Sequence, residues 1–306
     1  MRAQDGRHTA ARIKPSVRVA VTGAAGFIGG AICRRLAADG DEPIGVDLAG
    51  ADRRADISDA ATTVAALGGA DAVIHAAALV SERGRMDDFV RINVRGTRNV
   101  LDAAGSRRVV VLASVAAWGY EFTRELDEDA PPRPCGIPYI DTKGATEILA
   151  LRRGATVIRP GDVYGRGSQP WVVRPLEMLR RGQFVLPAPG DGLITPVYVD
   201  DLVDAIVRAL REPRAAGRAY TVWDGAAVTA REFFRYHARS LGQDDVRVLP
   251  APLLRLAARA IGAGPAAVTF VSRRATFPNT RAREELGWEP RFTLERGMAA
   301  TLGDRT

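Results

Sequence analysis

Short apolar runs alternate with longer segments of helical periodicity over the first half of the chain. The runs are rich in β-branched residues, which is typical of buried strands in a parallel sheet. They cover residues 17–21, 44–46, 72–74, 109–112 and 156–158. The intervening segments, such as 29–40 and 89–104, carry apolar residues at the spacing of one helix face. Alternating strands and helices predict an α/β fold with a doubly wound parallel sheet of the Rossmann type.

The pattern changes after residue 164, where Gly and Pro become frequent and the periodicity weakens. Further elements are predicted at 197–210, as a strand that leads into a helix, and as helices at 228–241, 252–261 and 281–286. We therefore expect a smaller mixed C-terminal region that binds substrate. The predicted organisation is a disordered tail at 1–16, a Rossmann domain at 17–164 to which 193–224 returns, and a substrate-binding region at 165–192 and 225–306.

Composition and charge argue against several classes of function. The chain is 46% hydrophobic and 26% charged, which is ordinary for a globular protein. No apolar run approaches the roughly 20 residues of a membrane span, and the first 16 residues lack the apolar core of a secretory signal, so we expect a cytoplasmic location without membrane association. The net charge is +7, but the basic residues form no block, which argues against nucleic-acid binding. The two cysteines and three histidines are scattered, so we expect neither a disulfide nor a metal site.

A glycine-rich motif at residues 22–29, TGAAGFIG, directly follows the first predicted strand and opens a helical pattern. Gly23 permits a tight turn, Gly26 lets backbone amides approach a pyrophosphate, and Gly29 allows close packing of helix on strand. The N-terminus of the helix then faces the phosphates, where its unpaired N–H groups and its dipole favour negative charge. A simple turn is the alternative interpretation, but the flanking strand and helix favour a dinucleotide site.

Asp47 ends the second predicted strand, 18 residues after Gly29. That separation is close to the one expected for an acid that binds a ribose 2′-hydroxyl. A carboxylate there repels the additional phosphate of NADP, so NAD is favoured over NADP as the cofactor. Two alternatives stay open. Asp47 is also placed to cap the following turn, and Arg53 and Arg54 lie just downstream, where they could reach the 2′-phosphate of NADP.

From Val19 through Asp201 the chain resembles the extended short-chain dehydrogenase/reductase family. The resemblance is carried by the GxxGxxG motif and by segments at 56–57, 75–78, 93–97, 159–165 and 282–288. It implies binding of a dinucleotide by an enzyme. The residues that it assigns to the cofactor are Gly23, Ala25, Gly26, Phe27, Ile28, Asp47, Asp56, Ile57, Ala76, Ala77, Ala78, Asn93, Tyr139, Lys143, Pro160 and Val163.

The candidate catalytic residues are Tyr139, Lys143 and Ser114. Tyr139 and Lys143 are four positions apart, so on a helix they share one face. A nearby ammonium is expected to lower the pKa of the phenol, which then exchanges a proton with an alcohol or carbonyl oxygen. Only two lysines occur in the chain, and Lys143 is the one that falls inside the predicted domain. Ser114 follows the strand at 109–112 and matches the catalytic Ser/Thr of the family.

Departures from the family indicate the class of substrate. Epimerases of nucleotide sugars usually carry Asn in place of Asp162 and Arg in place of Ile194. Dehydratases carry an acidic pair where this chain has Val115 and Ala116, or Ala116 and Ala117 if the alignment shifts by one. A carboxylate at 162 opposes a diphosphate. Aromatic residues at the predicted edge of the site favour an apolar or cyclic substrate. The predicted substrate-binding residues are Val80, Trp118 and Trp171.

We therefore expect an alcohol dehydrogenase or ketoreductase that acts on a small non-nucleotide substrate. Two alternatives stay open. Arginines such as Arg166 and Arg174 allow phosphate binding in another pose, and hence a nucleotide-sugar 4-epimerase. The second alternative is a Rossmann protein that binds a dinucleotide but catalyses no reaction. Because helices of the family commonly pair across a two-fold axis, the apolar Ile148, Leu149 and Leu151 suggest a homodimer.

Overall fold

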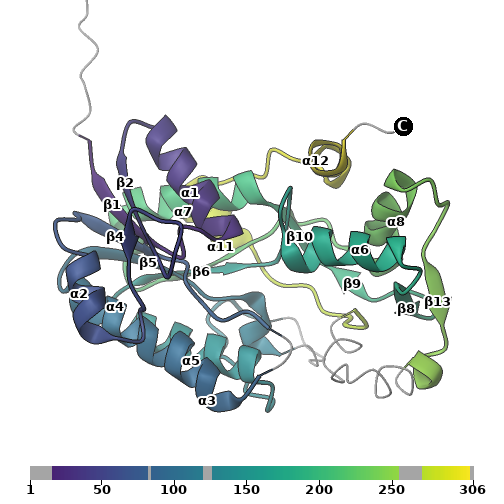
Figure 1. Cartoon of the computed structure of the whole chain (residues 1–306), viewed down its shortest axis with the longest axis horizontal. Coiled ribbons are helices and arrows are strands. Elements are labelled where there is room, and N and C mark those ends of the chain that lie inside the picture. The colour runs from purple at the N-terminus through teal and green to yellow at the C-terminus, as the bar shows by residue number, and fades with distance from the viewer. Residues whose placement is uncertain (1–15, 82–83, 120–125, 255–270, 304–306) are drawn as a thin grey trace, which may run out of the picture.

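A computed structural model of the protein describes residues 16–81, 84–119, 126–254 and 271–303, and its centre is a parallel sheet of seven strands. The strand order is β11-β6-β5-β4-β1-β2-β3 (Figure 1). The strands are β1 (Arg18–Thr22), β2 (Glu42–Asp47), β3 (Arg53–Arg54), β4 (Ala72–His75), β5 (Arg108–Leu112), β6 (Thr156–Pro160) and β11 (Ala219–Val222). The five predicted strands overlap β1, β2, β4, β5 and β6, and the predicted fold class is confirmed.

Helices cover both faces of the sheet because successive side chains of each strand point to opposite sides. In β1, Val19 and Val21 pack in the cluster that includes α1 and α7, whereas Ala20 packs in the cluster that includes α2, α4 and α5. Figure 1 shows these two sets of helices above and below the sheet. The helices and helical turns of this part are α1 (Phe27–Ala38), α2 (Ala60–Ala66), α3 (Met86–Phe89), η1 (Val90–Arg95), α4 (Gly96–Ala104), η2 (Val115–Trp118), α5 (Pro138–Arg152), α7 (Val199–Arg211), η4 (Pro213–Ala215) and α11 (Thr280–Leu286).

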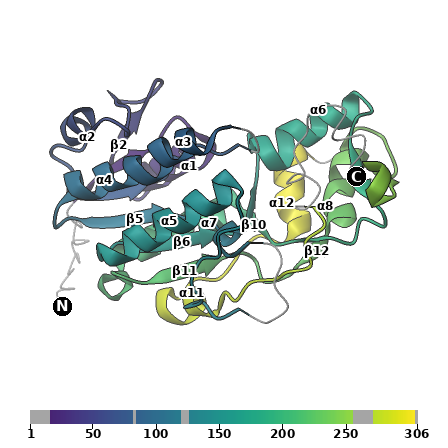
Figure 2. The same ribbon diagram turned by 90° about the horizontal axis from the view of Figure 1, so that it is seen from below.

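A second part of the molecule consists of short strand pairs and helices beside the sheet (Figure 2). Strand β7 pairs with β10, β8 with β13, and β9 with β12. Aromatic side chains join these elements, as where Phe184 packs 4.7 Å from Phe234 between ring centroids. The elements are β7 (Asp162–Tyr164), η3 (Gln169–Val173), α6 (Arg174–Arg180), β8 (Val185–Pro187), β9 (Leu193–Ile194), β10 (Pro196–Tyr198), β12 (Val228–Thr229), α8 (Ala230–Ser240), β13 (Arg247–Leu249) and α12 (Leu294–Leu302).

The segment 193–224 runs back to the central sheet. It contributes α7, which packs against α1, and β11, which lies parallel to β6 at the edge of the sheet. The predicted helix at 228–241 begins later, at Ala230, because Val228 and Thr229 pair with β9 and Thr229 caps the helix. Most of the predicted tail, and residues 255–261 of the predicted helix at 252–261, lie outside the described residues.

Candidate active site

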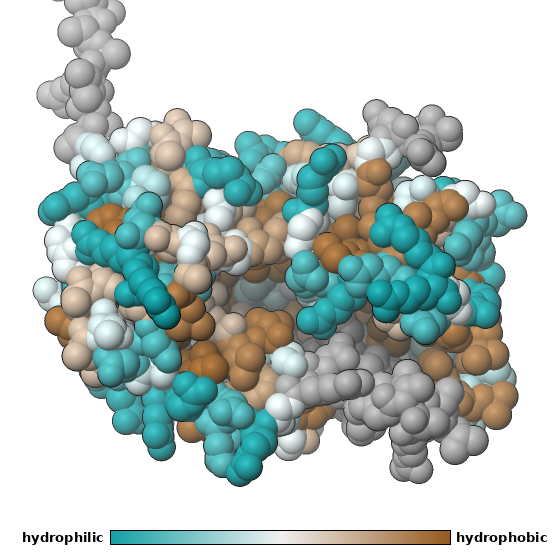
Figure 3. Space-filling model, viewed as in Figure 1, coloured by the Kyte–Doolittle hydropathy of each residue, from teal (hydrophilic) through white to brown (hydrophobic). Residues whose placement is uncertain are grey.

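A cavity of about 590 Å³ lies at the carboxyl ends of β1, β2, β4, β5 and β6. Ligands of open α/β sheets bind at this edge. The face in Figure 3 is hollowed between the two parts of the molecule, and brown, apolar residues border the hollow. Predicted site residues that line the cavity are Gly23, Gly26, Phe27, Ile28, Asp47, Asp56, Ile57, Ala76, Ala77, Ala78, Val80, Ser114, Tyr139, Lys143, Pro160, Val163 and Trp171.

The glycine motif forms the tight turn between β1 and α1. Gly23 has a φ of +75°, and a Cβ atom there would lie 2.8 Å from the backbone nitrogen of Ala77. A Cβ atom on Gly29 would lie 2.0 Å from the carbonyl oxygen of Gly23, so the helix packs directly on the turn. Among the described residues no side chain caps α1, and its first turn holds no acid. The amides of this helix end are therefore suited to an anionic group such as a pyrophosphate.

Asp47 holds the glycine-rich turn and also lines the cavity. Its carboxylate accepts hydrogen bonds from the backbone N–H groups of Ala25 at 3.0 Å and Leu48 at 2.7 Å. The guanidinium of Arg53 donates to the carbonyl oxygens of Ala66 and Gly68, at 2.8 and 2.6 Å, which ties it to the end of α2. The preference for NAD over NADP at Asp47 stays a prediction.

Tyr139, Ser114 and Lys143 meet at the carboxyl end of β5. The side chains of Tyr139 and Ser114 both line the cavity, and Ser114 lies close enough to Tyr139 to influence its pKa. Ser114 also caps the turn η2, because its hydroxyl accepts the N–H of Ala116 at 3.1 Å. Lys143 is buried, and its Nζ donates to the carbonyl oxygen of Leu112 at 2.8 Å. The helix α5 therefore presents the phenol and the amine to the same cavity, one helical turn apart.

The electrostatics of this group differ from the expectation in one respect. Burial raises the pKa of Tyr139, the nearby Ser114 opposes that rise, and the charge of Asp162 adds to it. The expected lowering of the Tyr139 pKa by Lys143 is therefore wrong for this arrangement, because desolvation of the phenol is the larger effect. Burial also lowers the pKa of Lys143, to about 8.

His75 lies beneath the site and holds three elements together. One ring nitrogen is 2.6 Å from the hydroxyl oxygen of Thr22 in β1, and the other is 3.0 Å from that of Thr97 in α4. Burial and the charge of Lys143 lower the pKa of His75 to about 3, so the ring is neutral near pH 7. This neutral link fixes the strand from which residues 76–78 enter the cavity.

Three predicted site residues, Ala25, Asn93 and Trp118, line neither this cavity nor the smaller one beside it. The N–H of Ala25 is used by Asp47. Asn93 is buried, and its amide exchanges hydrogen bonds of 2.7 and 3.2 Å with the backbone of Leu79, so it positions that segment. Trp118 is only 1% exposed, because it stacks on Phe277 and lies under the guanidinium of Arg159. The prediction that Trp118 contacts substrate is wrong, because the ring is a core residue.

A smaller cavity of about 150 Å³ adjoins the first beside Ser114 and Tyr139. Its wall is largely apolar, but Asp162 and Arg273 form a buried ion pair in it, and the exposed Arg174 lies at it. The apolar residues are Val80, Val115, Ala116, Ile137, Ile140, Pro170 and Trp171. Ile194 is buried in β9 and does not reach this wall.

Sequence reasoning missed several residues of these walls. The larger cavity is also lined by Leu79, Arg91, Ile92, Ser168, Gln169 and Pro170, and the smaller one by Arg273. Arg91 and Ile92 directly precede the segment at 93–97, so their position is a signal that was available. Arg273 is 111 positions from its partner Asp162, and no local pattern joins the two.

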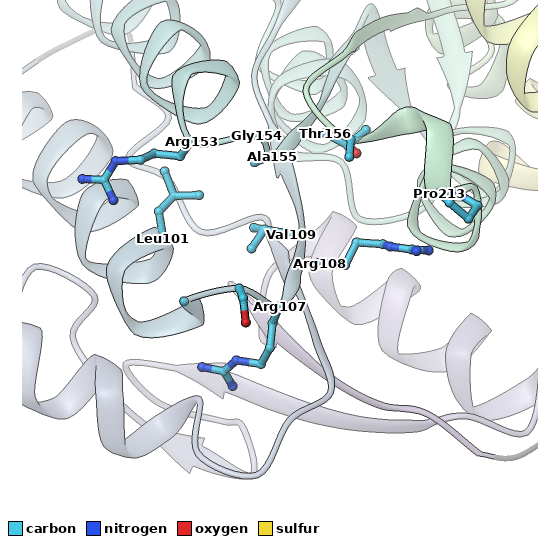
Figure 4. A pocket seen from close by; sticks show the side chains of 12 residues that line it. Leu101, Arg107, Arg108, Val109, Arg153, Gly154, Ala155, Thr156 and Pro213 are labelled. Atoms are coloured by element: carbon cyan, nitrogen blue, oxygen red, sulfur yellow. The ribbon is translucent and has the colours of Figure 1, made fainter.

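Another hollow, of about 420 Å³, lies at the opposite edge of the sheet, before β5 and β6 (Figure 4). The arginines that line it form hydrogen bonds within the fold. Arg107 donates to the carbonyl oxygens of Leu67 and Ala103, Arg108 to that of Leu210, and Arg153 to the carboxylate of Asp102. We therefore place the candidate active site at the carboxyl edge, where the glycine turn and Tyr139 meet.

The chain is similar to known proteins. The profile of the NAD dependent epimerase/dehydratase family matches residues 19–222. A UDP-glucose 4-epimerase of Mycolicibacterium smegmatis is 33% identical to the chain, over 94% of this chain and 97% of that protein. The chain belongs to this family. The resemblance to extended short-chain dehydrogenases/reductases is thereby confirmed.

The relatives of the chain are named for different reactions. A 2-alkyl-3-oxoalkanoate reductase of Stenotrophomonas maltophilia is 27% identical over 92% of this chain and 97% of the relative. The solved structure of MoeE5 in complex with UDP-glucose and NAD superposes with a TM-score of 0.77 at 27% identity, and covers 93% of this chain and 97% of that chain. The predictions of an enzyme and of NAD as the cofactor are confirmed at the level of the family.

The cavity fits NAD on the structure's own evidence. The turn at Gly23 and Gly29 leaves no room for Cβ atoms, the uncapped end of α1 opens toward the cavity, and Asp47 lies on its wall. Within the described residues, no helix combines the length and the apolar character that a membrane span requires.

Proposed function

We propose that the protein is an NAD-dependent alcohol dehydrogenase or ketoreductase that interconverts a secondary alcohol and a ketone on a small, neutral, non-nucleotide substrate. The observation that supports this most is the small, largely apolar cavity beside Ser114 and Tyr139. Its volume is about 150 Å³, and it shares Val80, Ser114 and Tyr139 with the larger cavity, so a substrate bound there lies next to the site assigned to the cofactor. A substrate that places its carbonyl oxygen at the Ser114–Tyr139 pair fits this cavity with its apolar part against Val115 and Ile140.

The cofactor, when bound, supplies or accepts a hydride at the reacting carbon. We assign its binding to the glycine turn, the end of α1, Asp47 and Lys143. Because burial raises the pKa of Tyr139, this phenol keeps its proton near neutral pH and donates it to the carbonyl oxygen in the reductive direction. Ser114, which lines the same cavity beside Tyr139, orients the same oxygen. The ammonium of Lys143 is held in place by its hydrogen bond to the carbonyl oxygen of Leu112.

The walls of the cavity argue against elimination chemistry. In either alignment the acidic pair of the dehydratases is replaced by apolar residues from 115–117, of which Val115 and Ala116 line the smaller cavity. They offer no side chain for a second proton transfer. Two relatives named for reduction of ketones support the proposal, the 2-alkyl-3-oxoalkanoate reductase and a ketoreductase of Stigmatella aurantiaca that is 29% identical over 76% of this chain.

A nucleotide-sugar 4-epimerase is the second candidate. Arg273 pairs with Asp162, which reduces the repulsion of a diphosphate that an isolated carboxylate would cause. Arg174 adds a cation at the same cavity. The UDP-glucose 4-epimerase that is 33% identical to the chain also favours this candidate.

The test is a panel of secondary alcohols, ketones and UDP-glucose, followed by the absorbance of NADH. Net formation or loss of NADH with an alcohol or ketone supports the oxidoreductase. Conversion of UDP-glucose to UDP-galactose without net change in NADH supports the epimerase instead.

Tyr139→Phe tests the catalytic assignment. We expect kcat to fall by about 10²- to 10⁴-fold, because the proton donor is lost, while the Kd for NAD stays within about twofold. The matched control is Tyr236→Phe, the same change in α8 and outside both cavities, which should keep full activity. Activity of Tyr139→Phe near that of the unmodified enzyme contradicts the assignment.

A further inference from the structure

Asp162 brings a buried carboxylate to the wall of the smaller cavity. It begins β7, directly after the segment that carries Pro160 and Gly161 past the larger cavity. Its side chain is 4% exposed, and it lines the same cavity as Ser114 and Tyr139. The carboxylate therefore faces whatever molecule has its reacting oxygen at the phenol.

The two oxygens of this carboxylate have unequal partners. Oδ2 accepts hydrogen bonds from the N–H and the hydroxyl of Thr195, at 2.7 and 3.2 Å, and from the Nη2 of Arg273. Oδ1 accepts no hydrogen bond from any residue that the structure describes. Oδ1 is not among the fully buried atoms of the described residues, so it is open to the cavity that Asp162 lines. A ligand that displaces water from this oxygen must supply a hydrogen-bond donor in its place.

Arg273 compensates the charge of Asp162 and is held in place by the neighbouring strand. Its side chain is 1% exposed, its Nε donates to the carbonyl oxygen of Leu193 at 2.9 Å, and its Nη2 donates to the hydroxyl of Thr195 at 3.2 Å. The pair is neutral as a whole. An anionic group placed against Oδ1 therefore meets a negative oxygen whose charge Arg273 balances but does not exceed. The further cation at this cavity, Arg174, is exposed, so solvent weakens its attraction for such a group.

We propose that Asp162 is a specificity-determining residue, and that its Oδ1 accepts a hydrogen bond from a second hydroxyl group of the substrate. The substrate class is then a neutral hydroxy ketone and the corresponding diol. A compound with a carboxylate or phosphate at that position is excluded. This inference rests on the proposed function, because it names the substrate of the same site.

The test compares the binding of cyclohexanone and 4-hydroxycyclohexanone to the protein loaded with NAD, measured by ligand-observed NMR. The unmodified protein should bind the hydroxylated probe at least about tenfold more tightly, as a hydrogen bond to a charged group allows. Asp162→Asn presents an amide with half the acceptor capacity and no charge, and should remove most of this preference. The matched control is Asp191→Asn, the same change at an exposed carboxylate that pairs with Arg274.

A second variant, Asp162→Asn combined with Arg273→Gln, removes both buried charges and keeps polar groups in the network. It serves if the single variant does not fold, and it should also lose the preference. Equal binding of the two probes by the unmodified protein, or binding of neither, overturns the proposal. A preference that survives in both Asp162 variants overturns it as well. Because binding is measured without turnover, these outcomes are separate from failure of the oxidoreductase assay, which bears on the proposed function alone.

Discussion

At the scale of single residues, the predicted preference for NAD over NADP depends on Asp47. Its carboxylate lies on the cavity wall and is fixed by the N–H groups of Ala25 and Leu48. For Asp47→Ala we expect the Kd for NAD to rise by about ten- to a hundredfold, because a charge-assisted hydrogen bond to the ribose is lost. The Kd for NADP should rise less, because repulsion of its 2′-phosphate is relieved. Titration of each dinucleotide by calorimetry measures both values.

The control for this prediction is Asp71→Ala. Asp71 binds the backbone N–H of Arg18 at 2.9 Å, at the other edge of the sheet, so neither Kd should change. Equal losses for NAD and NADP in Asp47→Ala would assign to Asp47 only the shaping of the glycine turn.

The residues that could be predicted are those whose chemistry depends on short spacing. Tyr139 and Lys143 share a helix face, and Gly23 and Gly29 belong to one turn, so the sequence alone indicates their roles. Trp118 shows the limit, because its burial under Arg159 depends on packing that no local pattern contains. The pairing of Asp162 with Arg273 could not be predicted for the same reason. Asp162 itself was recognised as a departure from the family, because epimerases usually carry Asn there.

At the scale of elements, the helix α5 is held to the sheet by a buried ion pair. Glu147, one turn after Lys143, accepts two hydrogen bonds from Arg159 of β6, at 2.8 and 2.6 Å, and both side chains are at most 3% exposed. For Glu147→Gln we expect the free energy of unfolding to fall by about 3–5 kcal/mol, because the guanidinium stays buried without its counter-charge. Urea unfolding followed by tryptophan fluorescence measures the change.

The double variant Glu147→Met with Arg159→Met should recover much of this loss, since no buried charge is then left unpaired. Asp87→Asn is the control, because its ion pair with Arg85 is more than 80% exposed on both sides and should contribute little. A single variant as stable as this control would mean that packing alone holds α5 on β6.

Strands β1, β2, β4, β5 and β6 of the central sheet were predictable because each contains a short, largely buried apolar run. Strand β3, Arg53–Arg54, has no apolar residue and was not predicted. The two-residue strands β9 and β12 were not, since Leu193–Ile194 and Val228–Thr229 are too short for any periodicity to be recognised. The same holds for β13, which pairs with β8 across about sixty residues of chain and takes its register from packing.

At the scale of the whole molecule, the homodimer stays a prediction. The structure reduces the set of α5 residues that could form its contact. Leu149 and Leu151 pack against the cluster beneath α5, so they belong to the core of the sheet. Ile148 is 40% exposed and is not part of that cluster. A dimer formed through α5 therefore needs Ile148 at its centre, where a charged side chain would lose its water on association.

We expect Ile148→Asp to convert the dimer to a monomer, measured by sedimentation velocity at micromolar protein concentration. Val64→Asp is the matched control, because Val64 is 59% exposed on α2 and lies apart from α5. It should leave the dimer intact. A monomeric unmodified protein contradicts the homodimer itself, whereas a dimer that persists in Ile148→Asp places the contact on another face. Helix α5 also carries Tyr139 and Lys143. If pairing of the two α5 helices stabilises the position of the Tyr139 phenol, Ile148→Asp should also lower kcat.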